Sequence, residues 1–165
     1  MSDWHDFFVA QVGASGVLAG LVFVGVSINL EKIMSTPAYG LPGRALEALI
    51  VLLAVLTVSS VLLVPGQETP LVGAEVLAVG VVDWAAVVGL QVLQLRHWRA
   101  LEPTLRWNFV LRVALGQTAT VPFVVAGVAV LSWGVVGLYW LVGGVVFSYL
   151  AAVTGAWVLL VEIHR

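Results

Sequence analysis

Charged residues are scarce in this chain: they make up 10% of its 165 residues, whereas an average soluble domain has about 25%. Cysteine is absent, which excludes a disulfide-bonded secreted scaffold. With seven basic residues, the chain also lacks the positive surface of a nucleic-acid-binding protein. Apolar residues are abundant instead, at 61% of the chain, and the mean hydropathy is +1.09. Neither a water-soluble fold of this size nor a disordered tail accommodates such a composition, so we expect a membrane protein.

Five stretches are long and apolar enough to cross a bilayer, which takes about 20 mostly apolar residues. We expect an all-α integral membrane bundle of five transmembrane helices, at about residues 7–30, 46–64, 71–95, 109–131 and 135–161. Only residues 132–134 separate the last two, but the whole block 109–161 is too long for one helix in a bilayer core of about 30 Å. Because the connecting segments are short, the chain 1–165 is expected to form a single transmembrane domain.

The basic residues predict the orientation of this bundle. With five spans, one side of the membrane receives all seven of them: Lys32, Arg44, Arg96, Arg99, Arg106, Arg112 and Arg165. The other side carries Asp3, Asp6 and Glu68. Since basic residues favour the cytoplasmic side, we expect the N-terminus outside and the C-terminus inside. We expect the membrane to be the cytoplasmic (inner) membrane of a bacterium, crossed several times.

The first span has two different faces at the helical spacing of about 100° per residue. One face holds small residues: Gly13, Gly16, Gly20 and Ser27. The GxxxG pattern of Gly16 and Gly20 allows two helices to approach closely. We interpret this face as a packing face, either between copies of the chain or against another helix of the same chain.

The opposite face of the first span has polar residues toward both ends and apolar residues between them: Gln11, Ser15, Leu18, Val22 and Asn29. In a homo-oligomer, such a face could line a pore with a hydrophobic constriction. Alternatively, Gln11 and Asn29 lie at the two membrane interfaces, where polar side chains cost little.

Asp83 lies near the middle of the third span, where a carboxylate costs at least about 2.5–3.5 kcal/mol. Helical spacing from Asp83 leads through Val87 and Leu90 to Gln94, so this helix alone gives no continuous polar path. We expect partners on neighbouring helices, from the set Gln117, Thr118, Thr120, Ser148 and Thr154. Asp83 is then a proton site, a cation site or a gate; in the alternative interpretation it only fixes helix packing.

The fourth span contains Pro122, which has no backbone N–H to donate to the carbonyl of Thr118. Together with the polar residues 117–120, Pro122 predicts a hinge with freed backbone groups, and such broken helices often line cavities. The sequence shows no Ser-His-Asp set, no HExxH, no Walker loop and no GxGxxG. We therefore expect no enzymatic activity, no cofactor and no metal site.

Several motifs of the first 70 residues form a recognisable set: WHDFF (4–8), GAS (13–15), FVGVSINL (23–30), RALE (44–47) and PGQ (65–67). This set resembles a group of small actinobacterial multi-pass membrane proteins, some of which are labelled modulators of an AAA membrane protease. The resemblance implies a membrane-protein partner and no catalytic residues. Residues 15–30 are also distantly similar to the pore helix of store-operated calcium channels. The acidic filter residue of those channels has no counterpart here, and the expected orientation is reversed.

The sequence thus favours a small homo-oligomeric channel or permease for ions, because any function must reside in the bundle itself. The alternative is a non-transporting accessory protein that binds another membrane protein, such as a membrane protease. The expected partners are the lipid bilayer, further copies of the chain and such a membrane protein, with no nucleic acid among them.

Overall fold

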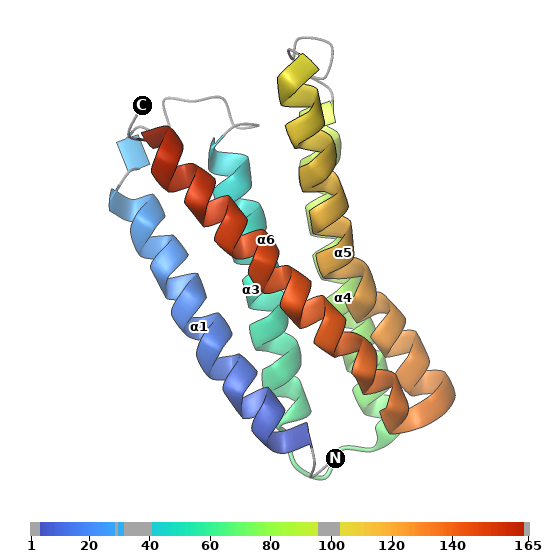
Figure 1. Cartoon of the computed structure of the whole chain (residues 1–165). Coiled ribbons are helices and arrows are strands. Elements are labelled where there is room, and N and C mark those ends of the chain that lie inside the picture. Colours follow the sequence, from blue (N-terminus) through green and yellow to red (C-terminus); the bar gives the residue numbers. More distant parts are fainter. Residues whose placement is uncertain (1–3, 29, 32–40, 96–102, 164–165) are drawn as a thin grey trace.

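The computed structural model describes residues 4–28, 30–31, 41–95 and 103–163, and all of these are helical except the loop at residues 63–68. The main elements in chain order are α1 (His5–Ile28), α3 (Leu41–Leu62), α4 (Thr69–Leu95), α5 (Pro103–Trp133), the 3-10 helix η3 (Gly134–Leu138) and α6 (Tyr139–Ile163). The expected all-α class is confirmed for this part of the chain. Figure 1 shows one elongated bundle.

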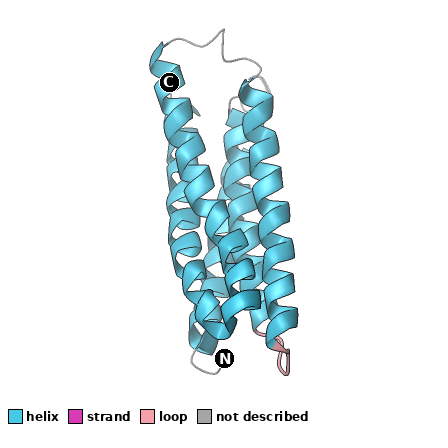
Figure 2. Ribbon diagram, turned by 90° about the vertical axis from the view of Figure 1, so that its right-hand side faces the viewer, coloured by secondary structure: helices cyan, strands magenta, loops and turns pink. Residues whose placement is uncertain are grey.

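The bundle has two distinct ends, which we name by the direction of α1. At the N-terminal end, α1, α4 and α6 begin, and the loop at residues 63–68 lies at this same end of the bundle (Figure 2). At the C-terminal end, α1, α4 and α6 finish while α3 and α5 begin. The helices run lengthwise through the bundle, with α6 crossing α3 at a slant (Figure 1).

Four helical stretches are long and apolar enough to cross a membrane: His5–Ile28, Pro42–Leu62, Thr69–Leu95 and Phe109–Trp157. Their length and composition make the chain a multi-pass membrane protein. The last stretch has 49 residues and comprises most of α5, all of η3 and most of α6. At Gly134 the backbone adopts a φ of +71°, a conformation that ends helices and favours glycine. The chain reverses there, so that α5 and α6 run in opposite directions (Figure 1).

Three helices begin before the spans predicted from the sequence, and each has a proline in its first turn. These prolines are Pro42, Pro70 and Pro103. Proline is tolerated there, since the first N–H groups of a helix have no intrahelical partner. As a result α3 begins at Leu41 rather than near residue 46, and α5 begins at Pro103 rather than near residue 109. Hydropathy marks the membrane-buried part of a helix, not its ends.

The interior changes character along the bundle axis. Toward the N-terminal end, a large apolar cluster joins all five long helices through residues such as Phe8, Leu62, Val76, Phe123 and Leu141. Toward the C-terminal end a smaller apolar cluster, which includes Val51 and Val87, shares the interior with polar side chains. The interior of the N-terminal half is therefore mostly apolar, with Ser59 among its few buried polar residues, whereas the amide and charged side chains of α4, α3 and α5 gather in the other half.

The close approach of α4 and α5 depends on glycine. A Cβ atom added at Gly127 of α5 would lie 2.5 Å from the backbone of Leu77 in α4. We therefore expect Gly127→Val to lower the free energy of unfolding by about 1–3 kcal/mol through overpacking. The measurement is unfolding of the detergent-solubilised protein by SDS titration, followed by circular dichroism.

Gly89→Val is the matched control, because Gly89 is an exposed helical glycine, and a Cβ atom added there would have no neighbouring atom within 4 Å. The two variants introduce the same side chain into a helix and differ only in what surrounds it. Equal stabilities of the two variants would contradict the close α4–α5 packing.

Candidate functional site: a buried polar cluster

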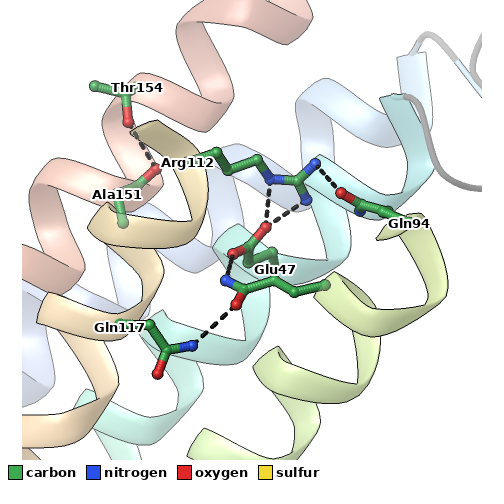
Figure 3. Close-up of polar contacts among 7 residues, drawn as sticks. Glu47, Gln94, Arg112, Gln117, Ala151 and Thr154 are labelled. Atoms are coloured by element: carbon green, nitrogen blue, oxygen red, sulfur yellow. Dashed lines mark hydrogen bonds and ion pairs between the residues drawn. The ribbon is translucent and has the colours of Figure 1, made fainter. Parts of the chain in front are cut away.

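An ion pair between Glu47 of α3 and Arg112 of α5 lies inside the bundle toward its C-terminal end. The Nε and Nη2 atoms of Arg112 both face Oε2 of Glu47 (Figure 3). The side chain of Glu47 is only 8% exposed and that of Arg112 only 17%. Nη1 of Arg112 donates a hydrogen bond of 3.0 Å to Oε1 of Gln94 in α4, so the guanidinium connects three helices.

Two glutamines and a tryptophan extend this ion pair into a hydrogen-bonded chain. Gln91 Nε2 donates to Glu47 Oε1 at 3.1 Å, and Gln117 Nε2 donates to Gln91 Oε1 at 2.9 Å. Trp84 Nε1 donates in turn to Gln117 Oε1 at 2.9 Å. In each of these three hydrogen bonds, the N–H group donates in the direction of Glu47. This arrangement favours a charged carboxylate at Glu47. We call these side chains the polar cluster: Glu47, Trp84, Gln91, Gln94, Arg112 and Gln117.

A small residue creates the space that the polar cluster occupies. Gly116 of α5 is buried, and a Cβ atom there would lie 2.5 Å from Nε2 of Gln91 and 2.8 Å from Oε1 of Glu47. The absence of a side chain at this position therefore lets the amide and the carboxylate meet against the backbone of α5.

Asp83 lies on the same face of α4 as Gln91 and Gln94, nearer to the middle of the helix. The residues buried on this face are Val72, Gly73, Val76, Gly80, Asp83, Val87, Gln91 and Gln94. Asp83 is only 5% exposed, and both of its carboxylate oxygens are buried without a hydrogen-bond partner in the described part of the chain. We expected the face of Asp83 to continue from Val87 through Leu90 to Gln94. This is wrong at Leu90, because the residue buried between Val87 and Gln94 is Gln91.

The partners expected for Asp83 are also wrong among the described residues. Gln117 bonds to Trp84 and Gln91, whereas Thr118, Thr120 and Thr154 donate to backbone carbonyls of their own helices. Ser148 is fully buried, and its Oγ has no partner either. A carboxyl group that is buried without a hydrogen bond to any described side chain is costly, which makes Asp83 a candidate functional residue.

The face of α1 that was expected to line a pore is instead buried inside the chain. Ser15 and Val22 are buried, Leu18 packs against the apolar cluster around Val51, and Oε1 of Gln11 accepts a hydrogen bond of 2.7 Å from Tyr149 of α6. Ser15 itself donates to the carbonyl of Gln11. In this conformation the face therefore packs inside the chain and is not free to line a pore between copies. Asn29 lies outside the described residues.

The small-residue face of α1 is open instead. A Cβ atom added at Gly13, Gly16 or Gly20 would have no atom of another element within 4 Å. Ser27 is exposed and donates to the carbonyl of Phe23 one turn earlier. Within the described residues, packing of this face against another helix of the same chain is not found.

Pro122 does not interrupt α5, which is one continuous helix from Pro103 to Trp133. It lies against α6, because a Cβ atom at Gly144 would be 3.3 Å from Cβ of Pro122. Thr118, four residues earlier, satisfies its hydroxyl with the carbonyl of Leu115. Among the residues that the structure describes, no group of three or more His, Cys, Asp or Glu side chains is arranged to hold a metal ion.

Comparison of the chain with protein-family models, with curated proteins and with solved structures gave no match. The resemblances of residues 4–67 therefore stay predictions, and the geometry of the bundle carries the functional argument.

Proposed function

We propose that this protein is a small ion permease of a bacterial cytoplasmic membrane, and that the polar cluster and Asp83 form its ion path. The supporting observation is the burial of ionisable and amide side chains inside membrane-crossing helices. Such groups are costly in a bilayer and commonly mark ion pathways or proton relays. No soluble part of the described chain offers another place for chemistry.

In this proposal the chain crosses the membrane five times, with its N-terminus outside and its C-terminus inside. The reversal at η3 supports two crossings within Phe109–Trp157, since 49 helical residues would span about 74 Å. The seven basic residues support the orientation, because five crossings put all of them on one side. The C-terminal end of the bundle is then the cytoplasmic end.

The ion path would enter between Gln94 and Arg112 at the cytoplasmic end and follow the buried face of α4 past Gln91 to Asp83. Beyond Asp83 toward the outside, the apolar cluster around Val76 and Phe123 closes the interior. Toward the cytoplasmic end, the fully buried Val87 separates Asp83 from Gln91, so the described conformation is closed on both sides of Asp83.

The proton is the ion that fits this path best. Both oxygens of Asp83 are shielded from water, so a hydrated metal ion would need the helices to separate. A proton needs only a short-lived chain of water molecules, and a carboxyl group with no fixed hydrogen bonds can accept and release it.

Ion flux into proteoliposomes of the purified full chain tests this function, with gradients of H⁺, Na⁺, K⁺ and Cl⁻ applied in turn. We expect the wild type to carry protons faster than empty liposomes, and Asp83→Asn to lower the flux to their level, since an amide does not take up a proton. Glu75→Gln is the matched control on α4, because Glu75 lies near the N-terminal end and bonds to Gln67. Its flux should equal that of the wild type.

The open glycine face of α1 favours a second function, the non-transporting accessory protein. Small residues at an interface let membrane helices pack closely, so Gly13, Gly16 and Gly20 suit a partner helix from another copy or another membrane protein. If the folded, correctly oriented chain carries none of the four ions, the permease is contradicted and the accessory function is favoured.

A further inference from the structure

A cavity of about 440 Å³ lies beside the Glu47–Arg112 ion pair, on the side away from α4. Its walls come from α3, α5 and α6, through residues that include Arg44, Glu47, Leu111, Arg112 and Thr154. Its size is within the range of small-molecule sites, about 300–1,000 Å³. Since α5 and α6 diverge toward the C-terminal end, and Leu111 and Thr154 are exposed, the cavity opens sideways toward the membrane (Figure 1).

The charges around this cavity do not balance. Arg44 and Arg112 contribute two positive charges, whereas Glu47 contributes one negative charge. The Glu47 carboxylate already accepts hydrogen bonds from Arg112 and Gln91. The positive charge of Arg44 repels that of Arg112. No described side chain forms an ion pair with Arg44, so its charge is available to an anionic ligand.

Most of the remaining lining is apolar, and part of it lies deeper in the membrane than Arg44. From Arg44 in the first turn of α3, the lining continues one turn on to Ala48 and then to Val51. At a rise of about 1.5 Å per residue, Val51 lies about 10 Å deeper than Arg44. Leu115 of α5 and Ala151 of α6 line the same deeper part. A ligand that fits has a negative group at the membrane surface and an apolar chain directed toward the membrane centre.

We propose that this cavity binds one anionic phospholipid from the leaflet at the C-terminal end of the bundle. Its phosphate would lie at Arg44, and an acyl chain would lie along Val51, Leu115 and Ala151. Basic pockets between membrane helices recognise phospholipid headgroups in this way. The cavity shares Glu47 and Arg112 with the polar cluster, but lipid binding depends on Arg44 and the apolar lining, so the proposal holds whether or not the protein carries ions.

Native mass spectrometry of the full chain in a non-ionic detergent tests the proposal, with phosphatidylglycerol or phosphatidylcholine titrated in. We expect the wild type to bind the anionic lipid about fivefold more tightly than the zwitterionic one, the effect of one basic residue near the headgroup. Arg44→Gln should remove this preference, whereas Arg44→Lys, which keeps the charge, should retain it.

Two further measurements separate a lipid from a free anion. Thr154→Phe places a ring at the mouth of the cavity and should weaken binding of both lipids, while inorganic phosphate should displace neither. Equal affinities of the wild type for the two lipids would overturn the proposal, as would an unchanged preference in Arg44→Gln. Displacement of the lipid by inorganic phosphate would also overturn it, because the site would then take free anions.

Discussion

Replacing Glu47 by leucine should lower the free energy of unfolding by about 3–5 kcal/mol, the cost of leaving one partner of a buried ion pair alone. The guanidinium of Arg112 would lose the carboxylate that its Nε and Nη2 atoms face, and the remaining acceptor would be Gln94. Gln91 would also lose its acceptor on α3. The single substitution therefore breaks contacts between three helices at once.

The double variant Glu47→Leu/Arg112→Met should recover most of the lost stability. Removing both charges avoids the desolvation of either, and apolar replacements of a buried pair are often neutral or stabilising by about 1–4 kcal/mol. SDS titration of the four proteins in this double-mutant cycle measures the coupling between the two side chains. A loss below about 1 kcal/mol in the single variant is typical of a solvent-exposed pair and would contradict the burial of this one.

Much of the helical architecture is predictable, because it depends on local features of the chain. Apolar stretches of the right length mark where helices cross the membrane, and Gly66 and Gly134, both with positive φ, mark two of the turns. The break at residues 132–134 is predicted from composition and corresponds to the reversal before η3. Helix ends are less predictable, since a helix continues into polar residues as far as its prolines and caps allow.

The Glu47–Arg112 pair is not evident when each residue is considered alone. In the sequence analysis, Arg112 is one of the seven basic residues that predict the orientation, and Glu47 is part of the RALE motif at residues 44–47. Both residues, however, lie within the first few positions of predicted spans that start at the same side, at residues 46 and 109. Opposite charges at equal depth inside two spans are a signal for pairing, and comparing the two spans in this way predicts the pair.

The orientation of α1 could not be predicted from its periodicity. In water, the apolar face of a helix is the buried one, but in a bilayer both faces of an apolar helix are acceptable. Periodicity therefore separates the glycine face from the face of Ser15 and Val22 without showing which of them packs inside. The choice depends on contacts with α3 and α6, including the distant bond from Tyr149 to Gln11.

Asp83→Val should make the protein more stable while removing its ion flux. The carboxyl group is buried with two unpartnered oxygens, and burial of an unpaired polar group costs about 1–3 kcal/mol. Valine removes that cost, and it has nearly the same helix propensity as aspartate. No described side chain gives the carboxyl group a hydrogen bond, and in the proposed function its role is ion transfer, not packing.

Asp83→Asn is the control that separates polarity from proton transfer. It keeps the shape and the buried polar atoms, so its stability in SDS titration should stay close to that of the wild type, whereas Asp83→Val should be more stable by about 1–3 kcal/mol. Both variants should lack proton flux in proteoliposomes. A loss of stability in Asp83→Val would instead show that the carboxyl group holds the helices together, and full flux in either variant would remove Asp83 from the ion path.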